Sequence, residues 1–339
     1  MDERVARVLA GEDAWVVGGA VRDDLLGRPV LDLDVVCREP ERAARAFAAQ
    51  ADGVPFPLSE KHASWRVVLD GGRTVDFTPV HGTIESDLAR RDFTINAIAR
   101  PLNGGEDVDP SGGRDDLQLR ELRAVSESIF DDDPLRLVRA VRLERELGFV
   151  LAPLTEQLVR AQAPLIRQAA GERILAELER LDAGGYRRLD ELGILAPLGG
   201  AIDERLDNYD SPRYRLVAVF GDNLRRYPIS RELGRYLSVM LRAEPLTGPS
   251  RRAIHRFRRA TAPWSRAALA YAGDRRFAGE LEEALAAPSE PPLVRGDELG
   301  IPPGPEIGRI LDMIEEEHAA GTISTREDAL ELARRETGE

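Results

Sequence analysis

Short apolar runs alternate with polar positions over residues 14–100. Four runs, each of about four to eight residues, are typical of β-strands because their apolar residues alternate or run without interruption. They are residues 14–19, 30–37, 64–70 and 73–80. Residues 39–51 instead show apolar spacing that predicts a helix. The pattern predicts a domain of α/β or α+β class.

The pattern changes from about residue 117, where the strand signals fade. Apolar residues then recur at helical spacing in segments that Gly, Pro and Asp interrupt. Residues 287–308 are rich in proline and glycine and are typical of a connector, and residues 306–321 are predicted as the final helix. We therefore expect an α+β protein with a head followed by an all-α neck, body and tail. The expected boundaries are 1–118 for the head, 119–185 for the neck, 186–290 for the body and 291–339 for the tail.

Composition narrows the class of protein. The chain has 339 residues, of which 42% are hydrophobic and 32% charged, as in soluble proteins with a sizeable core. Its apolar runs are far shorter than the roughly 20 residues of a membrane span, and its charged N-terminus is unlike a signal peptide. We therefore expect a cytoplasmic protein without a membrane partner. The net charge of −13 argues against indiscriminate nucleic-acid coating, although residues 213–236 and 250–259 are locally basic.

Two acids stand inside an otherwise apolar strand. Asp32 and Asp34 are two positions apart, so their side chains project to one face of a strand. Adjacent carboxylates repel each other unless a cation lies between them, and hard divalent cations prefer carboxylate oxygens. Because the single cysteine and four histidines provide no zinc-type cluster, the expected cation is Mg²⁺, with Mn²⁺ as the alternative. Asp76, in a neighbouring strand, is predicted to complete the catalytic cluster.

Two further segments carry candidate phosphate ligands. In "GGAVRD", Gly18 and Gly19 suit a turn at which the backbone approaches a ligand, and Arg22 could reach phosphate oxygens. In "RRDFTINA", residues 90–97, the arginine forks match phosphate geometry. Asp92 and Asn96 of that segment either bond sugar hydroxyls or cap a helix that is expected to start at this motif.

The segment "DDDPLRLVRAVRL" predicts a capped helix. Pro134 suits a first helical position, which makes Asp133 the expected cap, and Arg136 and Arg139 follow along the same side. Taken alone, this segment indicates a helix with solvated arginines. In residues 171–181, Arg173 and Glu177 are four positions apart and are predicted to form a bracing pair without a chemical role.

The order of these motifs carries a resemblance to a known family. "GGAVRD", "LDLD", "RRDFTINAIA" and "DDDPLRLVRAVRLERELGF" resemble class II tRNA nucleotidyltransferases, which include the CCA-adding enzymes, and bacterial poly(A) polymerases. The resemblance covers about the first 185 residues, and residues 296–333 are similar to the tail of many CCA-adding enzymes. It implies a mixed-sheet head like that of polymerase beta and transfer of nucleotides to the tRNA 3′ end without a nucleic-acid template.

The resemblance also implies roles for the candidate residues. Two Mg²⁺ ions on Asp32 and Asp34 would activate the primer hydroxyl and stabilise the departing pyrophosphate. Asp133 would accept a hydrogen bond from the amino group of cytosine or adenine, and Arg136 would donate to the adjacent ring nitrogen. Uracil would be rejected, because it presents a carbonyl to the carboxylate. The predicted nucleotide-binding residues are Gly18, Gly19, Arg22, Arg90, Arg91, Asp92, Asn96, Asp133, Arg136 and Arg139. Independently of the resemblance, the basic segment 250–259 supplies the predicted tRNA-binding residues Arg251, Arg252 and Arg256. We expect a monomer or a homodimer.

Several alternatives remain open on the sequence. The connection from Asp76 to the "RRD" motif is short, which in this family is associated with members that add CC. The expected substrate is therefore CTP, with ATP left open. A poly(A) polymerase shares the head motifs, and the acidic charge and the CCA-type tail count against it. A degenerate, non-catalytic RNA-binding module would be expected to lose the acids and arginines that are present here, and an unrelated helical regulator would leave the motif order unexplained.

Overall fold

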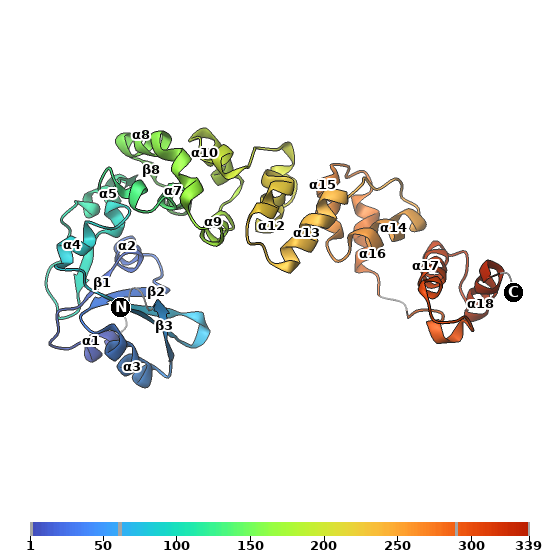
Figure 1. The fold of residues 1–339 in the computed structure, drawn as a ribbon, viewed down its shortest axis with the longest axis horizontal. Coiled ribbons are helices and arrows are strands. Elements are labelled where there is room, and N and C mark those ends of the chain that lie inside the picture. The colour runs from blue at the N-terminus through green and yellow to red at the C-terminus, as the bar shows by residue number, and fades with distance from the viewer. Residues whose placement is uncertain (1–2, 60–62, 289–290, 338–339) are drawn as a thin grey trace. The chain divides into compact units, whose positions relative to one another are not determined.

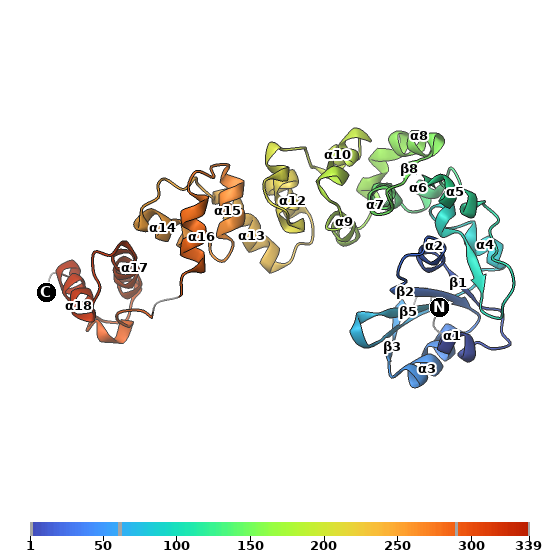
Figure 2. The same ribbon diagram turned by 180° about the vertical axis from the view of Figure 1, so that it is seen from behind.

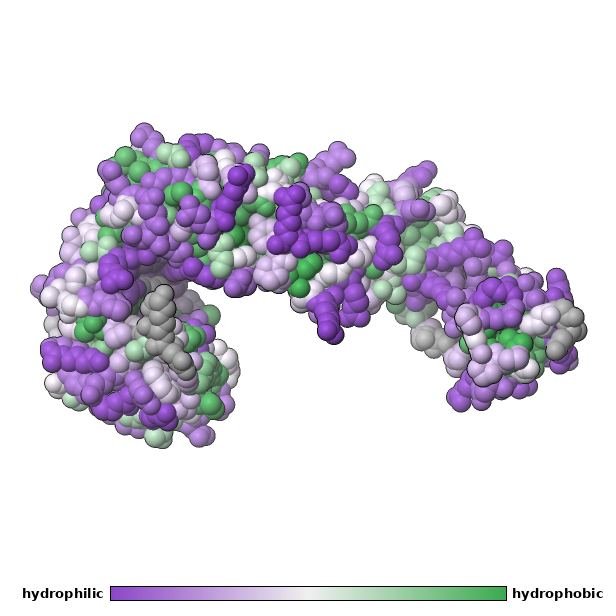
Figure 3. Space-filling model, in the orientation of Figure 1, coloured by the Kyte–Doolittle hydropathy of each residue, from purple (hydrophilic) through white to green (hydrophobic). Residues whose placement is uncertain are grey.

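The computed structural model describes residues 3–59, 63–288 and 291–337. The chain folds as two compact units, Met1–Leu198 and Gly199–Glu339. Within the described ranges, no helix is both long and apolar enough to cross a membrane. On the face seen in Figure 3, hydrophobic side chains form small scattered patches among hydrophilic ones.

The first unit begins with a six-stranded mixed sheet in the order β3-β4-β5-β2-β1-β6. Strands β2 and β5 are parallel, and every other neighbouring pair is antiparallel. The strands are β1 Trp15–Val17, β2 Asp32–Cys37, β3 Val54–Ser59, β4 Ser64–Val68, β5 Thr74–Pro79 and β6 Ala99–Pro101. The four strands expected from apolar patterning are therefore present, and the pattern missed the strands β3 and β6.

Helices cover the two faces of this sheet (Figures 1 and 2). Helices α1 (Glu3–Val8) and α3 (Pro40–Ala51) lie on one face, and α2 (Gly19–Leu25) lies on the other. The α3 face is apolar, because alternate residues of β2, β4 and β5 point to it and pack around Phe47. These buried residues are Leu33, Val35, Val67, Val75 and Phe77. The intervening residues of the same strands therefore point to the α2 side.

Helices dominate the rest of the first unit. They are α4 Ile84–Leu88, α5 Gly113–Leu119, α6 Ile129–Asp132, α7 Arg136–Leu147, α8 Pro153–Gln162, α9 Gly171–Leu178, α10 Ala183–Glu191 and α11 Leu195–Leu198. One departure from the all-helical neck is a short parallel pair, β7 (Glu121–Leu122) with β8 (Val150–Leu151). The 3₁₀ turns of this unit are Asp70–Gly72, Thr94–Asn96 and Ala163–Gln168.

The second unit contains helices and turns and no strand over residues 199–288 and 291–337. Its helices are α12 Pro212–Phe220, α13 Arg231–Arg242, α14 Arg251–Thr261, α15 Ser265–Ala272, α16 Ala278–Ala286, α17 Pro305–Ala320 and α18 Arg326–Thr337, and its 3₁₀ turns are Glu204–Asp207, Gly221–Arg226 and Gly296–Glu298. Helix α17 matches the helix expected over 306–321, but it is not the final one because α18 follows it. The two share a small apolar core formed by Val294, Ile310, Ile314, Ala329 and Ala333.

Candidate active site

Three carboxylates lie side by side on the face of the sheet that α3 leaves uncovered. Asp34 of β2 is the direct cross-strand neighbour of Asp76 in the parallel strand β5, and Asp32 is the neighbour of Thr74. Directly opposed residues of neighbouring strands project to the same face. Asp32, Asp34 and Asp76 therefore form one group, which we call the carboxylate row. Strand register brings together the acids that the sequence singled out.

Asp34 occupies an unusual electrostatic environment. Its side chain is open to solvent, yet protein surrounds it closely enough for desolvation to raise the pKa of its carboxyl. The charges of Asp76 and Asp32 raise this pKa further, whereas those of Arg91 and Arg139 oppose the shift. Across the three described ranges, the Asp34 carboxylate has no hydrogen bond or ion pair with another residue. An accessible carboxylate without a partner is a suitable ligand for a divalent cation.

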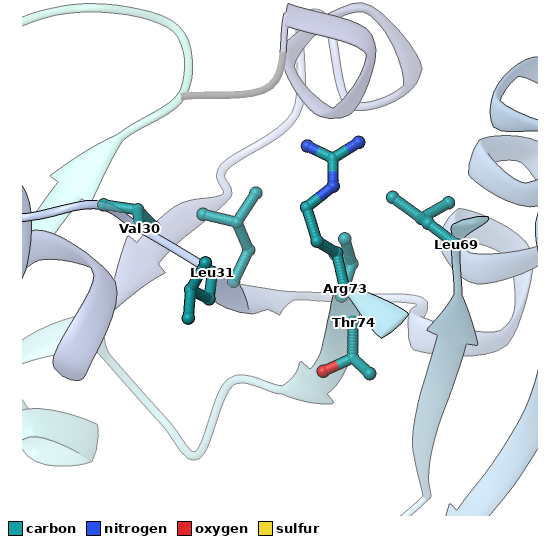
Figure 4. Close-up of a pocket in the computed structure, with 7 residues that line it drawn as sticks. Val30, Leu31, Leu69, Arg73 and Thr74 are labelled. Carbon is teal, nitrogen blue, oxygen red and sulfur yellow. The ribbon is translucent and has the colours of Figure 1, made fainter. Parts of the chain in front are cut away.

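Asp32 is fixed in place by the neighbouring strand. The backbone N–H and the hydroxyl of Thr74 both donate to Asp32 Oδ1, at 3.2 and 2.8 Å. Thr74 also lines a pocket of about 210 Å³ at the start of β2 and β5. Figure 4 shows Leu31 and Leu69 on opposite sides of Arg73, with Thr74 pointing the other way. The second Asp32 oxygen has no partner within residues 3–59, 63–288 and 291–337, so it remains available to a cation.

The glycine turn after β1 brings an arginine close to the carboxylate row. Gly18 has a φ of +74°, a conformation that side chains disfavour. A Cβ atom at Gly18 would lie 2.9 Å from Arg91 Nη1 and 3.2 Å from Asp34 Oδ2. The space beside Gly18 is therefore bounded by one cationic and one anionic group. A cationic and an anionic group side by side suit a ligand that carries both phosphate oxygens and a metal ion. Arg91 Nε is in addition buried without a hydrogen-bond acceptor.

The "RRD" segment forms a buried hydrogen-bond network. Asp92 Oδ1 accepts from the N–H of Phe93 and from Asn96 Nδ2, and Asp92 Oδ2 lies 2.7 Å from Arg139 Nε. Burial acts to raise the pKa of Asp92, but the charge of Arg139 and the hydrogen bonds outweigh it and lower the pKa below its usual range. Arg22 Nη1 donates to Asn96 Oδ1 at 2.7 Å. The network joins the glycine turn, the "RRD" segment and α7.

The helix expected to start at the "RRD" motif does not form. A single 3₁₀ turn, Thr94–Asn96, follows Phe93, so Asp92 and Asn96 brace a turn and do not cap an α-helix. Arg90 is exposed, and its backbone carbonyl accepts a hydrogen bond from Arg136 Nη2 at 2.7 Å. The short connection from Asp76 is ordered around α4, which begins after a capping box at Thr83.

Asp133 and Arg136 lie just before and at the start of α7, which begins two residues later than Pro134 suggested. Asp133 Oδ1 accepts a hydrogen bond from the N–H of Leu135. The expected capping contact of Asp133 is therefore made in the turn that precedes α7. Arg173 donates to both Asp133 oxygens, at 3.3 and 2.7 Å. The predicted pair of Arg173 with Glu177 was therefore wrong. Arg173 holds Asp133 instead, and Glu177 pairs with the buried Arg142.

The arginines expected to bind tRNA lie on α14, where most have partners within the second unit. Arg252 pairs with Glu317 at 2.6 Å, Arg256 pairs with Glu316 at 2.6 Å, and Arg259 pairs with Asp312. These acids belong to α17, which lies beside α14 in Figures 1 and 2. We call Arg252, Arg256 and Arg259 the arginine row. The side chain of Arg251, by contrast, has no hydrogen bond or ion pair in the described part of the chain.

Sequence reasoning missed three residues that hold the site together. Arg66 of β4 donates from Nε and Nη2 to the two oxygens of Asp76, both at 2.7 Å. Thr74 fixes Asp32, and Arg173 fixes Asp133. Arg66 had a visible signal, because it is a charged residue inside the apolar run 64–70. Thr74 and Arg173 are ordinary residues for a strand and a helix, so no comparable signal marked them.

Family models match this chain in two regions. Residues 14–82 and 66–123 match the poly A polymerase head domain. Residues 148–199 match the probable RNA and SrmB-binding site of polymerase A. The first region contains the carboxylate row and the glycine turn, and the second includes Arg173.

Curated relatives include a CC-adding tRNA nucleotidyltransferase of Thermus thermophilus, 32% identical over 94% of this chain and 92% of that protein. A CC-adding tRNA nucleotidyltransferase of Geobacter sulfurreducens is 48% identical over 50% of this chain and 40% of that protein. An A-adding tRNA nucleotidyltransferase of Deinococcus radiodurans is 44% identical over 54% of this chain and 44% of that protein. The chain thus matches less than half the length of these last two relatives.

Solved structures share the fold over nearly the whole chain. The CCA-adding enzyme of Thermotoga maritima in complex with tRNA has a TM-score of 0.76 and 24% identity, and covers 99% of this chain and 94% of its own. A complex of a CCA-adding enzyme with ATP has a TM-score of 0.80 at 22% identity, with the same coverage. Together with the Thermus relative, these likenesses confirm the predicted fold class of a nucleotidyltransferase head followed by helices. The chain therefore belongs to the family of class II tRNA nucleotidyltransferases and bacterial poly(A) polymerases.

Proposed function

We propose that this chain transfers CMP from CTP to the 3′ end of tRNA and stops after two additions. The observation that carries the proposal is the arrangement around Gly18, where Arg91 and the unpartnered Asp34 flank one space. Nucleotidyl transfer needs a cation to neutralise the developing charge and a basic group to hold the triphosphate. This space offers a place for both.

Asp32 and Asp34 would hold Mg²⁺, or Mn²⁺ in its place. The donor set fits a hard cation, because both groups are carboxylates on one strand face and Asp34 lacks a partner among the described residues. The cation would supply charge neutralisation and a more acidic primer hydroxyl. Gly18 and Gly19 keep the space open, and Arg22, Arg90 and Arg91 would orient the triphosphate. Asp76 supports the row from β5.

Choice of nucleotide is proposed to depend on Asp133 and Arg136. An ionised carboxylate has about four lone-pair sites, of which Arg173 and the N–H of Leu135 fill three of those on Asp133. One site is left to accept an amino group. Arg136 donates to the carbonyls of Arg90 and Ile129 and retains further N–H donors for the adjacent ring nitrogen. Cytosine and adenine satisfy this pair, whereas uracil presents a carbonyl to the carboxylate.

Two features support addition of CC over full CCA or poly(A). The connection between Asp76 and Asp92 is short and is organised around the five-residue helix α4. The relative matched over almost its full length, that of Thermus thermophilus, is named as CC-adding. The expected nucleic-acid contacts include Arg251, Arg252 and Arg256 on α14. Helices α13 and α14 border a groove of about 710 Å³, and Arg252 and Arg256 line it.

The test uses purified protein, Mg²⁺ and tRNAs that end at the discriminator base, at C or at CC, each with one labelled nucleotide. We expect CMP to extend the first tRNA by two residues and the second by one, and ATP to extend none. Extension of the CC-ending tRNA by a single AMP would contradict CC-only addition and favour CCA or A addition. Unlimited AMP addition would favour a poly(A) polymerase. No incorporation at all would favour a non-catalytic RNA-binding module.

A further inference from the structure

Arg66 extends the carboxylate row by one strand. It is the direct cross-strand neighbour of Asp76, which in turn is the direct neighbour of Asp34. The three side chains therefore project to the same face in the order Arg66, Asp76, Asp34. The Arg66 fork meets both oxygens of Asp76 at 2.7 Å, a bidentate geometry that fixes the carboxylate plane.

This contact changes the ligands that the row can offer. The Asp76 side chain is only 14% exposed, and that of Arg66 is 35% exposed, so the pair is partly shielded from solvent. Although three acids share the face, the described residues contain no group of three or more acids, histidines or cysteines placed to hold a metal ion. The fork holds the Asp76 carboxylate toward β4 and balances its charge there.

We propose that Arg66 is a positioning residue that keeps Asp76 out of the metal-ligand set, so that a divalent cation meets two carboxylates. This inference rests on the proposed function, in which Asp32 and Asp34 hold the cation. Removal of Arg66 would free Asp76 to turn toward Asp34 and would take one positive charge away from the site. Both changes strengthen cation binding. The wild-type arrangement would therefore bind the cation less tightly than the three acids allow.

The experiment measures Mn²⁺ binding to the full-length protein by electron paramagnetic resonance, without nucleotide or RNA. We expect Arg66→Gln to bind Mn²⁺ about tenfold more tightly than wild type. Asp76→Asn alone should weaken binding by less than about threefold, because it removes a nearby negative charge but no ligand while Arg66 holds Asp76. In the double variant, Asp76→Asn should cancel the tightening. Arg73→Gln is the matched control, since it removes an exposed arginine near Asp32 that pairs with no acid among the described residues.

Three outcomes would overturn the proposal. They are Arg66→Gln binding no tighter than Arg73→Gln, Asp76→Asn alone weakening binding about tenfold, and no Mn²⁺ binding by either wild type or Arg66→Gln. The Asp76→Asn result stands even where Arg66→Gln fails to fold. Because the assay contains no substrate, a failure to add CMP overturns the proposed function without deciding the Mn²⁺ result.

Discussion

The carboxylate row of the head and the arginine row of α14 are both clusters of like charge, but they differ in how the protein balances them. Each member of the arginine row has an acidic partner on α17. In the carboxylate row, Asp76 is balanced by Arg66, whereas Asp34 is left without a partner in the described residues and its pKa is raised. In the carboxylate row, the carboxylate that lacks a partner is therefore the one that we expect to bind a cation, whereas the charges of the arginine row are balanced within the second unit.

After the loss of Asp34 itself, the largest expected effect of a single substitution comes from filling the space beside Asp34. Gly18→Ala places a methyl group between Arg91 and Asp34 and strains a backbone with a φ of +74°. We expect kcat/KM for CTP addition to fall about a hundredfold, as for other displacements of about 1 Å within a reactive site. Gly27→Ala is the control, because Gly27 has a φ of +66° but no atom near its Cβ position. Equal losses in the two variants would attribute the effect to strain alone.

The next effect concerns Arg136, whose guanidinium donates to the backbone carbonyls of Arg90 and Ile129. Arg136→Lys keeps the positive charge but loses the planar fork that can hold a backbone carbonyl and a base together. We expect the preference for CTP over UTP, measured as the ratio of kcat/KM values, to fall about tenfold. Arg167→Lys should leave the ratio unchanged, since Arg167 also donates to a backbone carbonyl but carries no proposed role. An unchanged ratio in Arg136→Lys would separate this residue from base selection.

The ion pair of Asp92 with Arg139 in the first unit should stabilise the folded state. Asp92→Asn removes the charge that Arg139 faces, and we expect the free energy of unfolding at pH 7 to fall by about 2 kcal/mol. The pKa of Asp92 is lowered by folding, so its contribution is present above its unfolded pKa of about 4 and is lost as pH falls through the lower folded value. Urea unfolding from pH 7 down to pH 3 should show the two proteins converging at the acidic end. A constant difference would contradict this assignment.

The smallest effect tests the arginine row. Glu316→Arg replaces an acid that faces Arg252 and Arg256, and we expect the melting temperature of the full chain to fall by about 1–2 °C, because exposed ion pairs contribute little. Adding Arg256→Glu should restore part of the loss by reversing the pair. If the double variant is less stable than the single one, α14 and α17 are not held together by these charges.

The sequence predicted those parts of the site that depend on local periodicity. Alternation placed Asp32 and Asp34 on one strand face, and it located four of the six strands. It missed β3, whose two prolines are unusual in a strand, and β6, which has only three residues. The helix α18 was also missed, because its buried residues are the alanines Ala329 and Ala333, which make a weak apolar pattern.

Partnerships between distant segments could not be predicted. Helical spacing assigned Arg173 to Glu177, but the folded chain brings Asp133, 40 residues away, within reach of its guanidinium. The acids of α17 that pair with α14 are likewise more than 50 residues away in sequence. Such contacts depend on how helices pack, and the spacing of residues within one helix holds no information about them. Arg66 is intermediate, because strand alternation determines the face to which it points, but its partner depends on the register of β4 and β5.

The most direct test of the account compares one residue from each row in the same assay. Asp34→Asn, Arg256→Ala and the exposed control Asp70→Asn are each incubated with labelled CTP and tRNA ending at the discriminator base, and tRNA affinity is measured in parallel. We predict that Asp34→Asn lowers the rate of CMP addition about a thousandfold with tRNA affinity retained, whereas Arg256→Ala changes the rate less than about threefold. An Asp34→Asn rate within tenfold of wild type would contradict the claim that the unbalanced carboxylate marks the site of nucleotide transfer.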